Sequence, residues 1–169
     1  MEIIPQETID IIDDFINHLS PEQFLEFGER YLGKYEHLDG IINAAAEELK
    51  NPDAKELMAR LHVMTLKCFD YYAIELPAIP LTIAQSEMMK WGSHISKINP
   101  NFPDKAKLSL LRKSVTQRHL ADYIFNHIFE IPENLALFKK SEILPSVVVF
   151  YLTLNVFHNY VESVLPKEE

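Results

Sequence analysis

The sequence predicts an all-α fold: a bundle or irregular globule of seven to eight helices joined by short, proline-containing loops. Apolar residues recur at three- and four-residue spacing along most of the 169-residue chain, as they do on amphipathic helices. Proline repeatedly follows a capping residue where one apolar stripe ends and the next begins. With four glycines against ten prolines, the chain has too little glycine for a fold rich in tight β-turns.

The first third of the chain predicts three helices. The first has apolar residues at helical spacing over 9–19. The second begins at Ser20, where a serine cap precedes proline and a glutamine three residues after the serine completes a capping box. Gly33 is expected to end this helix. The third helix follows an apolar stripe over 35–49, in which Gly40 costs about 1 kcal/mol relative to alanine.

The middle of the chain predicts two longer helices. The fourth helix begins at Asn51, which again precedes proline, and runs to Glu75. Two prolines make residues 76–80 an extended connector. The fifth helix carries the most regular apolar stripe in the chain, with alternating steps of three and four residues. The members of this stripe are Leu81, Ala84, Met88, Trp91, Ile95 and Ile98.

Three helices are expected in the last third. A long helix over about 104–130 is apolar on two sides in its second half, which predicts that it packs between two neighbours. A short helix over 133–140 precedes the last one, which begins at Pro145 and ends near Leu165. Residues 147–152 have high strand propensity on their own. Because no second strand candidate pairs with them, a helix is favoured there.

No linker or repeat divides the chain, so residues 1–169 are expected to form a single domain. Residues 143–161 carry no formal charge over 19 residues, which is long enough to cross a membrane. Their polar side chains, among them Asn155, are costly in lipid, so a buried central helix is favoured over a C-terminal membrane anchor. The N-terminus lacks the features of a secretion signal and the single cysteine suits a reducing interior, so a cytoplasmic location is expected.

Charge is distributed unevenly along the sequence. The chain has 16 Lys and Arg against 25 Asp and Glu, a net charge of −9, and residues 1–60 alone hold 14 acids and five bases. Residues 90–118 reverse this balance, with seven bases and one acid. Either the two regions are simply solvated or attract each other, or the acidic third binds a basic partner. Nucleic acid is not an expected partner, because the basic region lacks the interleaved aromatic residues that stack on bases.

The acidic side chains of the first two predicted helices are the candidate partner-binding residues. They are Asp10, Asp13, Asp14, Glu22, Glu26 and Glu29. We expect them to bind a basic protein surface, or the chain to pair with itself through an exposed helix stripe. The sequence thus favours a non-enzymatic protein that acts through protein–protein interaction.

The sequence contains no recognisable catalytic or metal-binding motif. The Glu-x-x-His, His-x-x-x-His and His-Glu-x-x-His patterns of metal ligands are missing, as are the Gly-rich phosphate loop and the Gly-x-Ser-x-Gly elbow. Five histidine–carboxylate pairs lie three or four residues apart, about the number that chance gives for seven histidines and 25 acids. We therefore expect neither a metal nor a cofactor, and an enzymatic activity is not favoured.

The alternative hypothesis is a small-ligand- or metal-binding helical bundle with an internal pocket of histidines and carboxylates. His119 and Asp122 lie on the apolar face of the long predicted helix. For a pocket they would face inward, as a base with its orienting acid or as ion ligands. The favoured interpretation is structural: a buried hydrogen-bonded pair, or a pair on a helix face that stays exposed. His158 and Glu162 lie one turn apart at the edge of the polar arc of the last helix. Trp91 is a further ligand-binding candidate, because the glycine after it lets a ligand or another helix approach closely, and packing in the core is the favoured interpretation.

Overall fold

The structure of the chain is a computed structural model that describes residues 3–72 and 78–164, and it confirms the predicted all-α class. Within these residues there are nine α-helices, one 3₁₀ turn and one π-helical turn, and no strand. The α-helices are α1 (Gln6–Asn17), α2 (Pro21–Glu29), α3 (Glu36–Glu47), α4 (Pro52–Phe69), α5 (Leu81–Ser96), α6 (Asp104–Arg112), α7 (Arg118–Phe125), α8 (Pro132–Leu135) and α9 (Lys140–Val164). The 3₁₀ turn (Asp70–Tyr72) follows α4, and the π-helical turn (Asn126–Glu130) follows α7.

The helix starts that combine a cap with proline are confirmed. At the start of α2, the Ser20 hydroxyl accepts a hydrogen bond from the Gln23 backbone N–H at 3.3 Å, and the Gln23 side chain accepts one from the Ser20 N–H at 2.9 Å. At the start of α4, the side-chain oxygen of Asn51 accepts from the Asp53 N–H at 3.0 Å. These bonds satisfy backbone donors that the first turn of a helix leaves without partners.

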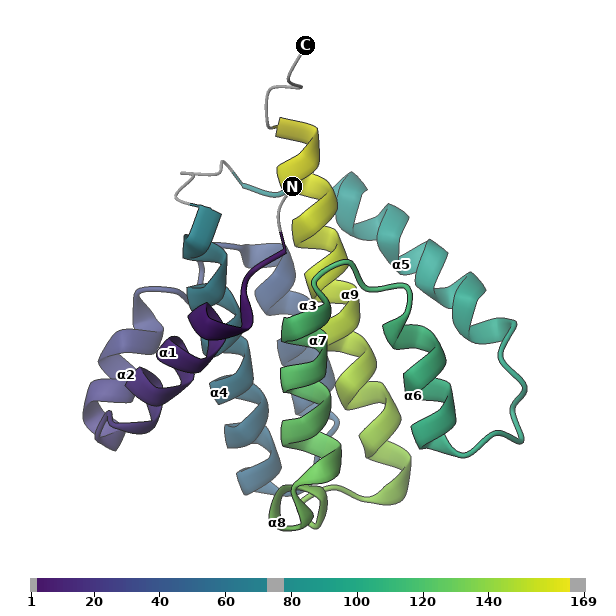
Figure 1. The fold of residues 1–169 in the computed structure, drawn as a ribbon, viewed down its shortest axis with the longest axis horizontal. Helices are drawn as coiled ribbons and strands as arrows, with labels where there is room; N and C mark the ends of the chain where they lie inside the picture. The colour runs from purple at the N-terminus through teal and green to yellow at the C-terminus, as the bar shows by residue number, and fades with distance from the viewer. Residues whose placement is uncertain (1–2, 73–77, 165–169) are drawn as a thin grey trace.

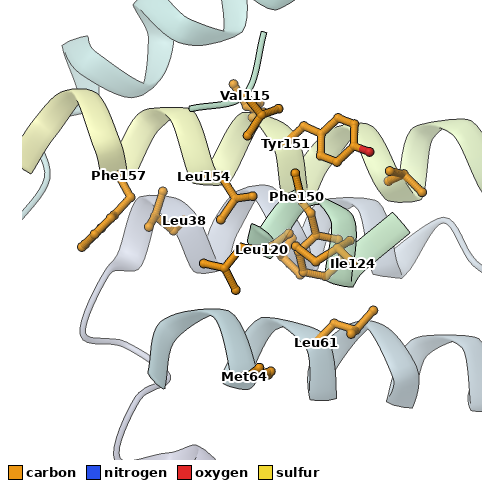
Figure 2. Packing of buried hydrophobic residues seen from close by; sticks show 14 of the residues in the cluster. Leu38, Leu61, Met64, Val115, Leu120, Ile124, Phe150, Tyr151, Leu154 and Phe157 are labelled. Atoms are coloured by element: carbon orange, nitrogen blue, oxygen red, sulfur yellow. The ribbon is translucent and has the colours of Figure 1, made fainter. Parts of the chain in front are cut away.

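Helix α9 is the centre of the fold (Figure 1). It packs against α3, α5, α6 and α7, and most of its residues are buried. Figure 2 shows how Phe150 and Leu154 of α9 meet Leu120 and Ile124 of α7 in the core. Among the described helices, α9 is the one long and apolar enough to cross a membrane by length and composition, and 56% of its most apolar window is buried among the other helices. The preference for a core helix over a membrane anchor stays a prediction.

The long helix expected over 104–130 is broken. Helix α6 ends at Arg112, residues 113–117 leave helical geometry, and α7 begins at Arg118. A side chain of α9 stabilises this break, because Asn155 accepts a hydrogen bond from the Thr116 N–H at 3.3 Å and donates one to the Ser114 carbonyl at 2.9 Å. Helix α7 does pack between two neighbours, α1 and α9, as its two apolar sides predicted.

Three other boundaries differ from the predicted ones. Helix α4 ends at Phe69 rather than Glu75, where the 3₁₀ turn follows it. Helix α8 is only four residues long, and α9 begins at Lys140, so that Pro145 lies inside it instead of opening it. The connector predicted over 76–80 lies partly outside the described residues.

The apolar stripe of α5 is buried along one edge only. Ala84 and Trp91 are buried against the core, whereas Leu81 and Met88 are each 51% exposed and Ile95 is 39% exposed. This difference arises because α5 lies at the rim of the molecule, packed on α9 and α3, and none of the other described helices covers its outer edge (Figure 1).

Candidate functional site

Helices α1 and α2 carry the predicted acidic residues at one end of the molecule (Figure 1). Five of the six are exposed, and they recur along the outer sides of the two helices. These five, Asp10, Asp14, Glu22, Glu26 and Glu29, are named here the acidic surface. Residues 6–30 hold seven acids and a single arginine, so this end of the molecule is strongly negative.

Among the described residues, the carboxylates of the acidic surface make local interactions only. Asp14 lies 3.5 Å from His18, and Glu26 accepts a hydrogen bond from Arg30 at 2.9 Å, in both cases within one helical turn at exposed positions. Hydrogen bonds from a backbone amide and from the Ser20 hydroxyl hold the pKa of Glu22 below its ordinary value. Exposed ion pairs of this kind contribute little to stability.

Three acids of this surface lie where the helix dipole is unfavourable to them. The last turns of α1 and α2 contain no basic residue, although the C-terminal end of a helix is negative and favours cations. Asp14 lies in the last turn of α1, and Glu26 and Glu29 lie in the last turn of α2. With respect to the dipole, these three acids therefore do not stabilise the helices that carry them, whereas Glu22 in the first turn of α2 is favourably placed.

Large apolar side chains lie among the acids of this surface. Ile11 is 64% exposed, Phe15 is 47% exposed and Leu25 is 67% exposed. Phe15 of α1 also packs edge-on against Phe27 of α2 with ring centroids 5.3 Å apart, which holds the two helices together. The acidic surface therefore combines negative charge with exposed apolar area.

Asp13 is the one predicted acid that is not on this surface. It accepts a hydrogen bond from the Tyr123 hydroxyl of α7 at 2.5 Å. Burial, reinforced by the Asp13 carboxylate, raises the pKa of Tyr123, so the hydroxyl keeps its proton and donates it to this bond. This bond ties α1 to α7.

Asp13 also lines a cleft of about 380 Å³. Helices α1, α4, α7 and α8 and the π-helical turn contribute to its walls, and π-helical turns are frequent at functional sites. The His127 ring is oriented by a 2.9 Å hydrogen bond from its Nδ1 to the Tyr123 carbonyl. The polar lining residues are Asp13, Asn17, Asp53, Glu56, Arg60, Tyr123, His127 and Asn134. Apart from Asp13, the sequence pattern did not indicate these residues, because they come from three stretches far apart in the chain, 13–17, 53–61 and 123–137.

His119 and Asp122 do not face inward as a ligand pocket requires, and the alternative of a pair on an uncovered helix face is the one that the structure has. Because the helix breaks before Arg118, the faces of α6 and α7 are not continuous, and His119 is exposed. Asp122 forms a 2.8 Å ion pair with Arg112 across the break. In the described part of the chain, no hydrogen bond or ion pair joins His119 to Asp122, or either of them to His158.

The other predicted ligand-binding residues also lie apart. His158 Nε2 is 3.4 Å from the Glu162 carboxylate, and burial lowers the pKa of His158 against the opposing effect of that carboxylate. Trp91 is buried and packs against Tyr151, with ring centroids 6.2 Å apart. Of the five residues proposed for an internal pocket, the structure therefore brings together only His158 and Glu162.

The described residues contain no group of three or more His, Cys, Asp or Glu side chains arranged to hold a metal ion. Comparisons with protein-family models, with curated proteins and with solved structures find no match to this chain.

Proposed function

We propose that this protein acts without catalysis, by binding a basic and amphipathic protein segment on the acidic surface of α1 and α2. The observation that carries the proposal is the combination of seven acids against one arginine in residues 6–30 with exposed Ile11, Phe15 and Leu25 on the same two helices. Negative charge attracts and orients a basic partner, and removal of apolar area from water stabilises the complex.

The partner chemistry follows from the spacing of these residues. Glu22, Leu25 and Glu29 lie on one side of α2, three and four residues apart. A helical segment with lysines or arginines on either side of an apolar stripe matches this alternation, because its cations reach the carboxylates while its apolar stripe covers Leu25.

The test is a binding titration with a fluorescent synthetic helical peptide whose leucines and lysines recur at three- and four-residue spacing. We expect saturable binding that weakens roughly tenfold between about 0.01 M and 0.1 M salt, because screening shortens the range of the attraction. The triple variant Glu22→Gln/Glu26→Gln/Glu29→Gln should bind more weakly. The control Glu47→Gln/Glu48→Gln/Glu133→Gln removes the same charge from exposed positions outside the acidic surface and should bind as the unmodified protein does.

Two results would contradict the proposal. One is an affinity that is the same at both salt concentrations. The other is an equal loss of affinity in both triple variants, because this would make net charge, and not the acidic surface, the cause of binding.

The cleft supports small-ligand binding as a second candidate function. In the described structure, the carboxylates of Asp53 and Glu56 make no ion pair and His127 Nε2 makes no hydrogen bond. The cleft therefore offers more unused hydrogen-bond acceptors, on Asp53, Glu56 and His127, than Arg60 has free N–H groups. This excess of acceptors favours a small organic cation that carries N–H donors.

Calorimetric titration with a short aliphatic diamine tests this second function. Asp53→Asn/Glu56→Gln should abolish saturable binding, whereas Glu47→Gln/Glu48→Gln should leave it unchanged. Binding that survives the first variant would refute a site in the cleft.

A further inference from the structure

The end of the molecule opposite α1 and α2 has the reverse charge. Residues 90–118 carry seven bases and one acid, and they run from the second half of α5 through α6 to the start of α7. Four of these bases pair with nearby acids: Lys90 with Glu87, Lys105 with Glu130, Lys107 with Asp104 and Arg112 with Asp122. The remaining three, Lys97, Lys113 and Arg118, are exposed and make no ion pair with any described residue.

This basic end also exposes several large apolar side chains. Leu81, Met88 and Ile95 recur every seven residues along the uncovered edge of α5, and Met89 beside them is 72% exposed. Phe102 and Leu110, on the α5–α6 connection and on α6, are 43% and 40% exposed. Methionine adapts its shape to different partners, so such a stripe suits a contact surface. Together with Lys97, Lys113 and Arg118, the bases that make no ion pair in the described part of the chain, these apolar residues are named here the basic surface.

The acidic and basic surfaces match each other in chemistry and are separated in space. Each combines exposed apolar side chains with charge, and the charges are opposite. Figure 1 shows α2 at one end of the longest axis and α5 at the other, so the two surfaces of one copy face away from each other. Only a second copy can bring them together.

We infer that the acidic surface of one copy binds the basic surface of a second copy, so that the chain assembles head to tail. This inference rests on the proposed function and names its partner. A symmetric dimer through either surface would place like charges opposite one another, which is unfavourable. A head-to-tail contact is heterologous, so each bound copy leaves one acidic and one basic surface free, and chains of copies form unless the rotation closes a ring.

The experiment is sedimentation velocity of the full chain over a range of concentrations at low and high salt. We expect the average mass to rise above the 19.6 kDa of one copy with concentration at low salt, and to fall back at high salt. Two charge reversals are compared: Glu22→Lys/Glu26→Lys/Glu29→Lys on the acidic surface and Lys97→Glu/Lys113→Glu/Arg118→Glu on the basic surface.

Each reversed protein alone should sediment as a monomer, because both of its surfaces then carry the same sign. An equimolar mixture of the two should associate again, because each surface then meets an oppositely charged one. Circular dichroism confirms that both variants remain helical.

A wild-type protein that stays monomeric at every concentration would overturn the inference. So would self-association of the separate variants, or a mixture that stays monomeric. None of these results bears on binding of the basic peptide to the acidic surface, so failure of the inference can be told apart from failure of the proposed function.

Discussion

Two glycines show how the same residue type has opposite effects at different positions. Gly33 lies in the turn after α2 with a φ of 88°, which L-residues adopt only with strain. Its N–H donates a 2.5 Å hydrogen bond to Asp39. Gly40 lies within α3 with ordinary helical geometry, and open space surrounds the position of a Cβ atom.

We therefore expect opposite changes in the free energy of unfolding from two matched substitutions. Gly33→Ala should lower it by about 1 kcal/mol, because the alanine Cβ is strained at positive φ. Gly40→Ala should raise it by about 1 kcal/mol, because alanine favours the helix. Urea unfolding measures both changes, and a shift in the same direction for the two variants would contradict this explanation.

His158 makes stability depend on pH. Burial lowers its pKa below the ordinary value of 6.5, so between these two values the unfolded chain binds the proton more tightly than the folded one. The free energy of unfolding should therefore fall as the pH drops below about 6.5. His158→Gln should reduce this slope in urea unfolding at a series of pH values, and His119→Gln controls for loss of one imidazole from the chain. An unchanged slope in His158→Gln would show that this histidine does not contribute.

Residue patterns predicted local features and missed distant partners. The capping box at Ser20 involves residues three apart and was visible in the sequence. The contact of Tyr123 with Asp13 spans 110 residues, and the buried hydrogen bond of His62 with Asp39 spans 23. No spacing rule connects residues so far apart. The cleft that Asp13 and Tyr123 line could therefore not be predicted from a single sequence.

At the scale of elements, the break between α6 and α7 shows where periodicity fails. The apolar spacing continues through residues 113–117, so it predicted an unbroken helix. The interruption depends instead on Asn155 of α9, whose amide bonds to the backbone at Ser114 and Thr116. A tertiary contact therefore stabilises the end of α6 and the start of α7. Because α7 begins anew at Arg118, His119 lies on an exposed face.

Removal of that contact should destabilise the fold. Asn155→Ala leaves two backbone groups without their side-chain partner at a position only 8% exposed, so we expect the free energy of unfolding to fall by about 1–3 kcal/mol. Asn159→Ala, one turn further along α9, removes an amide that makes no hydrogen bond with any described residue and should change it by less than about 0.5 kcal/mol. Equal losses in the two variants, measured by urea unfolding, would count against this role for Asn155.

At the scale of the whole molecule, the charge distribution along the sequence becomes a separation in space. The acids of residues 1–60 and the bases of residues 90–118 were apparent from composition, but their arrangement at opposite ends required the fold. The exposed apolar residues could not be selected beforehand, because Met88 belongs to the same regular stripe as buried Trp91. A helical stripe shows that a face is apolar, and the neighbours decide whether it is covered.

The location of the protein stays a prediction at this scale. A cytoplasmic protein with α9 as its core helix should remain in solution without detergent, and recovery only in the membrane fraction would favour the anchor instead.

The most direct test of the two-surface account is the change in backbone amide NMR shifts when the protein is diluted at low salt. If the acidic surface of one copy binds the basic surface of another, the amide shifts of α1, α2, α5 and α6 change with concentration while those of α8 stay fixed, and about 0.2 M salt removes the change. Shifts that do not change on dilution, or that change mainly outside these four helices, would contradict it.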